Sequence, residues 1–267
     1  MFGGVLGDII GSRFEFDRGG KRKDFELFTK ECEYTDDSVM TAAIAEALLE
    51  AGKEADSETV KTKVIEQMCN WGKRYPDAGY GGMFRKWLRS KDHKPYGSYG
   101  NGSAMRVSAA GWLYDSLAKT REVARWTAEV SHNHPEGIKG AECTAAVIYL
   151  GRTGKNKEEI KRYVEQEFGY DLWETLEELR DRHEHNESCM DSLPKALTSY
   201  FKGNSYEDVV RNAVSLGGDT DTLAAIAGAM AESCYEIPAE MISEGKKYLD
   251  KDLLAVLEKI NTERIHE

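Results

Sequence analysis

The chain has 267 residues, of which 40% are hydrophobic and 31% charged, and it carries a formal net charge of −11. This composition provides apolar residues for a packed core, so wholesale disorder is not expected, and the acidic balance disfavours general binding to nucleic acid or to anionic membranes. The five cysteines form no CxxC pair, no apolar run reaches the roughly 18 residues of a membrane span, and the N-terminal residues lack a basic region, so we expect a cytoplasmic protein with free thiols.

The N-terminal segment, residues 2–11, is rich in glycine and apolar residues and predicts a short helix that packs closely against a neighbour. Asp8 and Glu15 lie seven residues apart and would share one face if this helix continued through both. For Asp8 we favour a packing hydrogen bond over a ligand role. Glu15 could equally be a solvated carboxylate or a functional one, since exposure is the usual state of glutamate.

A polar and charged loop is expected over residues 17–30, and an alanine-rich helix follows it. That helix begins at Thr35-Asp36-Asp37 and continues through Leu49 with apolar residues at helical spacing. One hydroxyl or carboxylate at such a start is an ordinary N-cap. The additional oxygen-bearing side chains leave a ligand role open.

The middle of the chain alternates amphipathic helices with glycine-rich loops. Helices are expected over residues 54–75 and 83–88, followed by a loop, Pro95–Val107, that is rich in glycine, serine and tyrosine. Bare backbone amides in such a loop can bind phosphate oxygens, although neither the P-loop nor the GxGxxG pattern is present and a plain flexible turn is the alternative. His132 precedes a further alanine-rich helix that Pro135 is suited to open.

Residues 152–191 form the most charged part of the chain, with helices expected over residues 155–168 and 172–181. His183, His185 and Cys189 suggest zinc, but a fourth ligand at suitable spacing is lacking, so we do not favour it. Amphipathic helices are expected over residues 192–201 and 206–215, and one or two more over residues 239–260.

The second oxygen-rich helix start is Asp219-Thr220-Asp221-Thr222, which follows two glycines and precedes a run of small apolar residues. Hard cations such as Mg²⁺ prefer carboxylate and hydroxyl oxygens, whereas a simple capping cluster is the alternative. If this start meets the one at Thr35-Asp36-Asp37, at least four carboxylates converge, and they could not all stay ionised without cations. A two-metal site would resolve the repulsion.

Almost no segment alternates with the period of a strand, so the chain predicts a single all-α domain over residues 1–267 built around glycine- and alanine-rich helices. No internal repeat is evident.

Five motifs, taken together and in this order, resemble the ADP-ribosylglycohydrolase family, which includes the dinitrogenase reductase-activating glycohydrolases. The motifs are Gly7-Asp8-Ile9-Ile10-Gly11 with Glu15, Tyr34-Thr35-Asp36-Asp37, Tyr99-Gly100-Asn101-Gly102-Ser103-Ala104-Met105-Arg106, His132-Asn133-His134-Pro135 and Gly217-Gly218-Asp219-Thr220-Asp221-Thr222. The resemblance implies an orthogonal multi-helix bundle with a binuclear metal site at the N-termini of central helices. One departure is Ser38, where the family often has threonine, but a hydroxyl is kept.

The resemblance also implies roles for individual residues. Two Mg²⁺ or Mn²⁺ ions would be bound by Thr35, Asp36, Asp37, Asp219, Asp221 and Thr222, with Asp221 as the bridging candidate. Glu15 would be a further ligand or the catalytic carboxylate, with Asp36 and Asp37 as alternatives. The diphosphate and distal ribose of ADP-ribose would be bound by Ser98, Tyr99, Gly100, Asn101, Gly102 and Ser103, with His132 contacting the phosphate or ribose.

The implied activity is metal-dependent hydrolysis of the bond at ribose C1″, which releases ADP-ribose from an ADP-ribosylated protein or small molecule. An ADP-ribose-binding module without turnover and a different two-metal nucleotide hydrolase are the alternatives. The acceptor, whether arginine, serine, a nucleobase or a small molecule, is left open. The leaving group is expected to face loops near residues 16–30 and 80–94.

Overall fold

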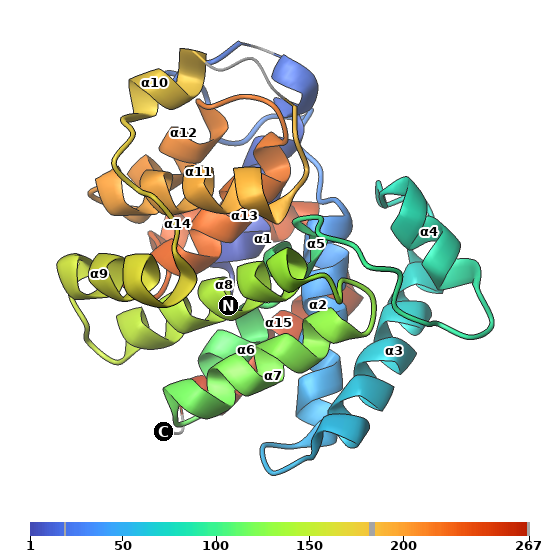
Figure 1. Ribbon diagram of the computed structural model, residues 1–267. Helices are drawn as coiled ribbons and strands as arrows, with labels where there is room; N and C mark the ends of the chain where they lie inside the picture. The colour runs from blue at the N-terminus through green and yellow to red at the C-terminus, as the bar shows by residue number, and fades with distance from the viewer. Residues whose placement is uncertain (19, 182–184, 266–267) are drawn as a thin grey trace.

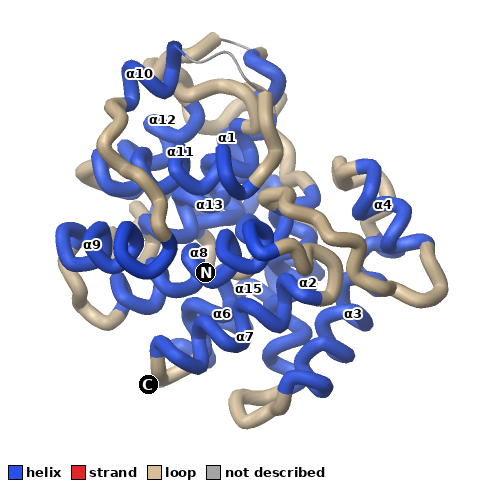
Figure 2. The backbone as a smooth tube through the Cα atoms, viewed as in Figure 1, coloured by secondary structure: helices blue, strands red, loops and turns tan. Residues whose placement is uncertain are grey.

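The computed structural model describes residues 1–18, 20–181 and 185–265. In this part of the chain every regular element is a helix, and no strand is present (Figure 2). The helices in chain order (Figure 1) are α1 Gly3–Ser12, η1 Glu15–Asp17, α2 Asp36–Ala51, α3 Ser57–Arg74, α4 Gly82–Arg89, α5 Gly102–Met105, α6 Ser108–Leu113, α7 Leu117–Glu129, α8 Pro135–Arg152, α9 Lys157–Phe168, α10 Leu176–Asp181, α11 Cys189–Lys202, α12 Tyr206–Val214, α13 Thr220–Ala231, α14 Ala239–Gly245, η2 Lys246–Tyr248 and α15 Lys251–Ile265. The expectation of an all-α fold is confirmed.

Helices α1 and α13 lie at the centre of the bundle, and all of their residues are buried. Gly3, Gly7 and Gly11 recur every four residues and therefore share one face of α1. A methyl group added at Gly7 would lie 2.1 Å from the carbonyl oxygen of Ala224 in α13. Only glycine allows the two backbones to approach this closely, so the small residues of α1 and α13 are needed for the packing of these helices.

The other helices surround this pair. Helix α2 packs on α3 and α15, and α8 packs on α6 and α7. Helices α11 and α12 pack on α13, whereas α4 stands apart from the bundle next to α3 (Figure 1). The buried apolar side chains form one continuous core that extends from Met1 to Ile260. This continuous core supports the expected single domain. The extent of that domain, residues 1–267, stays a prediction.

Several element boundaries differ from the expected ones. The helix expected over residues 172–181 begins only at Leu176, because the left-handed Gly169 ends the preceding helix and Tyr170 and Leu172 are buried in the irregular segment that follows. The C-terminal region is divided between α14, η2 and α15. Helix α1 ends at Ser12, so Asp8 and Glu15 do not lie on one continuous helix.

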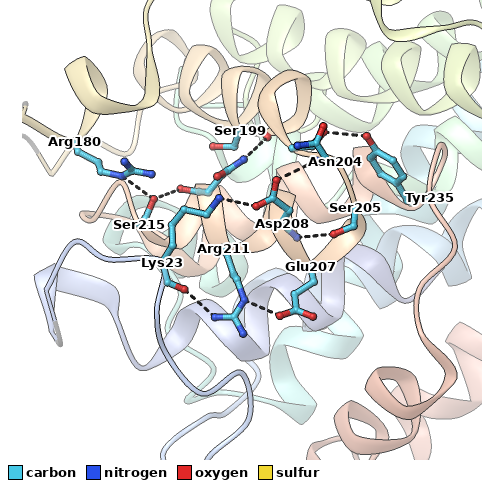
Figure 3. Close-up of polar contacts among 12 residues, drawn as sticks. Lys23, Arg180, Ser199, Asn204, Ser205, Glu207, Asp208, Arg211, Ser215 and Tyr235 are labelled. Carbon is cyan, nitrogen blue, oxygen red and sulfur yellow. Dashed lines mark hydrogen bonds and ion pairs between the residues drawn. The ribbon is translucent and has the colours of Figure 1, made fainter.

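The polar loop expected over residues 17–30 is tied to α12 by a group of polar contacts (Figure 3). The guanidinium of Arg211 donates to the carbonyl oxygens of Lys23 and Phe25 at 2.8 and 2.7 Å, and the ammonium of Lys23 lies 2.5 Å from the carboxylate of Asp208. Arg180 donates to the hydroxyl of Ser215 at 2.9 Å, which joins α10 to the end of α12. The loop is thereby anchored at one end of the central helix pair.

Among the described residues, no helix combines the length and apolar character needed to cross a membrane.

Candidate metal centre and ligand cleft

The two oxygen-rich helix starts meet in the structure. Thr35 is the N-cap of α2, and its hydroxyl accepts from the backbone amide of Asp37. The hydroxyl of Thr222, in the first turn of α13, donates to Oδ2 of Asp37 at 3.2 Å. The positive ends of two helix dipoles therefore face the same group of carboxylates. This is the convergence that the sequence led us to expect.

Asp8 joins α1 to the start of α2. Its carboxylate accepts from the backbone amides of Thr35 and Ser38, at 2.9 and 3.1 Å, and from both of their hydroxyls. Burial raises the pKa of Asp8 to about 6, and these hydrogen bonds counteract part of the rise. The geometry agrees with the packing hydrogen bond that we favoured for this residue.

The glycines before Asp219 shape the start of α13. Gly217 and Gly218 have φ values of 75° and 74°, a conformation that glycine adopts without steric cost. The turn places Asp219 as the N-cap, and the side-chain amide of Asn101 donates to its Oδ2 at 2.6 Å. Asn101 also donates to Ser192 at 2.9 Å, so the glycine-rich loop is connected to both α13 and α11.

The carboxylates form two overlapping groups that could each hold a cation. Carboxylate oxygens of Asp8, Asp37 and Asp221 lie within 4.8 Å of one another, and so do those of Glu15, Asp219 and Asp221. Asp221 belongs to both groups. Within the described part of the chain, Oδ1 of Asp37 and Oδ1 of Asp221 are buried without a hydrogen-bond partner. A buried carboxylate oxygen left unpaired is costly, and a hard cation is the partner that would satisfy it.

Burial raises the pKa of every aspartate in this cluster. The pKa of Asp36 rises to about 8 because of burial and then the charges of Asp8 and Asp219. The pKa values of Asp37 and Asp221 rise well above the ordinary range, first through burial and then through neighbouring carboxylates. Without a cation the cluster therefore retains protons, and a divalent ion would displace them.

Glu15 reaches the cluster from a strained turn. The next residue, Phe16, has a φ of 58°, which is unusual for a residue with a bulky side chain, and its backbone amide donates to the carbonyl oxygen of Gly218 at 3.0 Å. This contact fixes η1 beside the turn that leads to Asp219. Glu15 is half-buried, and burial followed by the charge of Asp219 raises its pKa.

The glycine-rich loop, Tyr96–Gly102, lies opposite the carboxylates. The backbone amide of Asn101 donates to the carbonyl oxygen of Glu187 at 2.7 Å, and Gly100 pairs with Ser188 in an isolated antiparallel bridge. Gly102 directly covers His132, because a methyl group at Gly102 would lie 3.0 Å from Nε2 of that ring. The loop is thus held in a defined shape between α11 and His132.

His132 is held as a neutral donor. Its pKa falls well below the ordinary range because of burial and the nearby charge of Arg106. Arg106 donates to the hydroxyl of Ser131 at 2.9 Å, and that hydroxyl lies 2.8 Å from Nδ1 of His132. A serine hydroxyl that donates to Nδ1 leaves the ring hydrogen on Nε2, next to Gly102.

These elements enclose a cleft with a volume of about 620 Å³, a size typical of small-molecule sites. The predicted site residues that line it are Glu15, Thr35, Asp36, Asp37, Ser98, Tyr99, Gly100, Asn101, Gly102, His132, Asp219, Asp221 and Thr222. Ser103 is not among the lining residues, because it is buried and its hydroxyl donates to the carbonyl oxygen of Gly137 at 2.7 Å.

Two further walls complete the cleft, and only the first was expected in part. The turn at Gly79–Phe84 forms one wall, and Asn186, Glu187 and Ser188 form another. The only sequence signal for the first wall was the expectation that residues 80–94 face the leaving group. The second wall follows a charged region in which residues 182–184, including His183 of the zinc alternative, lie outside the described residues.

The sequence profile of the ADP-ribosylglycohydrolase family matches residues 1–265. The human protein named ADP-ribosylhydrolase ARH3 is 26% identical, with 96% of this chain and 90% of that protein covered. The Rhodospirillum rubrum protein named ADP-ribosyl-[dinitrogen reductase] glycohydrolase is 24% identical, with 95% and 91% covered. A solved structure titled ADP-ribosylglycohydrolase-related protein complex has the same fold, with a TM-score of 0.75, 21% identity and coverage of 98% of this chain and 93% of that chain.

Proposed function

The chain belongs to the ADP-ribosylglycohydrolase family, and from this premise we propose that it hydrolyses the bond between ribose C1″ and the acceptor atom of an ADP-ribosylated protein or small molecule. The proposed cofactors are two Mg²⁺ or Mn²⁺ ions, and the product is ADP-ribose. The observation that carries the proposal is that two clusters of three carboxylates share Asp221. Among the described residues, Oδ1 of Asp37 and Oδ1 of Asp221 in these clusters are buried without a hydrogen-bond partner.

The proposed metal ligands are the side chains of Thr35, Asp36, Asp37, Asp219, Asp221 and Thr222. Oxygen donors of this kind fit a hard cation, and the orphaned oxygens of Asp37 and Asp221 support their assignment. Two such ions, when bound, would offset the charge of the carboxylates, orient the ribose hydroxyls and lower the pKa of a water molecule.

The proposed site for the diphosphate and distal ribose is the loop that contains Ser98, Tyr99, Gly100, Asn101, Gly102 and Ser103. Backbone amides in a loop that leads into a helix attract anions. His132 would donate from Nε2 to a phosphate or ribose oxygen, and its low pKa keeps it neutral while it does so. Ser103 would act indirectly, by holding the loop on α8 through Gly137.

Glu15 is the proposed catalytic carboxylate, with Asp36 and Asp37 as alternatives. Cleavage at C1″ passes through a transition state with oxocarbenium character, as in other glycosidic hydrolyses. A carboxylate at the edge of the cleft can accept a proton from the attacking water and stabilise the developing positive charge.

The test is product analysis with defined substrates. The full chain is incubated with ADP-ribosylated arginine, serine, nucleobase and small-molecule substrates, with Mn²⁺, with Mg²⁺ or with a chelator, and products are identified by mass spectrometry. Metal-dependent release of intact ADP-ribose is expected, and the panel identifies the acceptor. Release of AMP would indicate a phosphodiesterase, and tight binding without turnover would indicate a binding module. Full activity of the Asp219→Ala/Asp221→Ala variant would refute the proposal.

A further inference from the structure

The segment 82–94, which comprises α4 and the loop after it and is called the α4 arm below, is strongly basic in an acidic protein. It carries five exposed cationic side chains, at Arg85, Lys86, Arg89, Lys91 and Lys94. Among the described residues, Asp92 is the one carboxylate paired with any of them, at 3.3 Å from Lys94, and both partners are highly exposed. Arg85 donates to the carbonyl oxygen of Tyr80 at 3.1 Å, whereas Lys86, Arg89 and Lys91 form no ion pair in the described part of the chain and can meet an external anion. The chain as a whole has a charge of −11.

The arm is a fixed element of the fold. Phe84 and Trp87 are buried and stack at 5.4 Å, so the apolar face of α4 is already occupied. The ring of His93 lies 5.0 Å from that of Trp87, and its Nε2 lies 3.3 Å from the thiol of Cys69 in α3. These contacts leave the basic face turned outward, on a helix that stands apart from the bundle (Figure 1).

The arm borders the cleft on the side of the carboxylates. Gly82, Met83 and Phe84 line the cleft, and the preceding turn brings Gly79 next to the side chain of Asp36. Met83 is 60% exposed, and across the cleft Phe16 is 55% exposed. Flexible methionine and exposed aromatic side chains at the mouth of a site are typical of surfaces that bind other proteins.

We propose that the α4 arm is the docking surface for the protein part of the substrate, and that it selects modified residues flanked by aspartate or glutamate. This inference rests on the proposed function, because the bond to be cut would lie at the carboxylate cluster and the arm lines the cleft beside that cluster through Gly82, Met83 and Phe84. An acidic segment would be repelled by the cleft floor and by the net charge of the molecule, and the arm supplies the local attraction. The exposed apolar groups beside the cations favour a peptide over a nucleic acid.

The expected effect is a gain in encounter rate and a lower KM for acidic substrates. Charges at the rim of an interface act mainly on association and are weakened by salt. Reversing three of the five cations is expected to lower kcat/KM for an acidic peptide by about 10- to 100-fold at low ionic strength, and by much less at about 0.5 M salt.

The test compares two variants of the full chain, loaded with Mn²⁺. The first is Lys86→Glu/Arg89→Glu/Lys91→Glu. The control, Lys202→Glu/Lys251→Glu/Lys259→Glu, makes the same change in net charge at exposed lysines that do not line the cleft. Each is assayed with an ADP-ribosylated peptide with acidic flanks, the same peptide with neutral flanks, a free ADP-ribosylated amino acid and an ADP-ribosylated oligonucleotide. Fluorescence anisotropy of the two peptides, measured with each variant in a Glu15→Gln background, gives their Kd values with turnover suppressed.

The arm variant should lose kcat/KM and affinity only for the acidic peptide, and the control variant should keep both. An equal loss on the free amino acid would overturn the proposal, because the arm would then belong to the ADP-ribose site or to the folding core. Unchanged values for the acidic peptide, or a loss confined to the oligonucleotide, would also overturn it. An inactive wild-type chain refutes the proposed function instead, and in that case the two Kd values still decide the docking question.

Discussion

Replacing Gly7 by alanine would separate α1, which carries Asp8, from α13, which carries Asp221. The added methyl would lie 2.1 Å from the carbonyl oxygen of Ala224, where ordinary contact begins at about 3.4 Å, so α1 and α13 must move apart by about 1 Å. Overpacking of this kind costs about 1–3 kcal/mol, and alanine returns about 1 kcal/mol through its higher helix propensity. We expect a net loss of up to about 2 kcal/mol and a Tm lower by up to about 4 °C.

Gly4 provides a matched control in the same helix. A methyl group at Gly4 would lie 3.3 Å from the carbonyl oxygen of Ala225, which a small shift can accommodate, so Gly4→Ala should be neutral or more stable by up to about 1 kcal/mol. Thermal unfolding and Mn²⁺ titration of both variants are the assays. Gly7→Ala should also bind Mn²⁺ more weakly, because Asp221 moves with α13. Equal stability and equal metal affinity of the two variants would refute this packing argument.

Three further predictions concern the carboxylates. The metal-free protein should lose stability as the pH rises from about 4 to about 8. The pKa values of Asp8 and Asp36 are raised to about 6 and about 8, so the folded chain holds protons that the unfolded chain releases. Thermal unfolding across this range should show a falling Tm and Asp36→Asn should flatten the slope, whereas a rising Tm would contradict the assignment. Asp8→Asn should lower the free energy of unfolding by about 1–3 kcal/mol, because its amide NH₂ would face the donors of Thr35 and Ser38, and urea unfolding should detect the loss. Glu15→Gln should lower kcat by about 10²- to 10⁴-fold with little change in Tm, and an unchanged kcat would shift the catalytic role to another carboxylate.

Local sequence was sufficient to locate the helix starts that carry the site. Thr35-Asp36-Asp37 and Asp219-Thr220-Asp221-Thr222 both head helices, because capping groups followed by a run of small apolar residues have few alternatives. Their convergence was a condition of the two-metal hypothesis rather than a result of local sequence, and it was the resemblance to the family that implied it. The glycine spacing of α1 indicated close packing but not which helix is the neighbour.

Features that depend on tertiary contacts could not be predicted from the sequence. The role of Asp8 in joining α1 to α2, and the contact of Asn101 with Asp219, connect residues 27 or more positions apart. The walls of the cleft at Gly79–Phe84 and Asn186–Ser188 arise from how separate helices meet. Ser103 illustrates the reverse case, because its motif suggested a ligand contact whereas its hydroxyl is used by α8.

The most direct test of the account is calorimetric titration of Mn²⁺ into the full chain and into Asp221→Asn. We expect two Mn²⁺ ions per wild-type chain, with proton release as the carboxylates ionise. The variant should lose at least one ion, since Asp221 belongs to both carboxylate groups. A wild-type chain that binds no Mn²⁺, or a variant that binds two ions as tightly as the wild type, would contradict it.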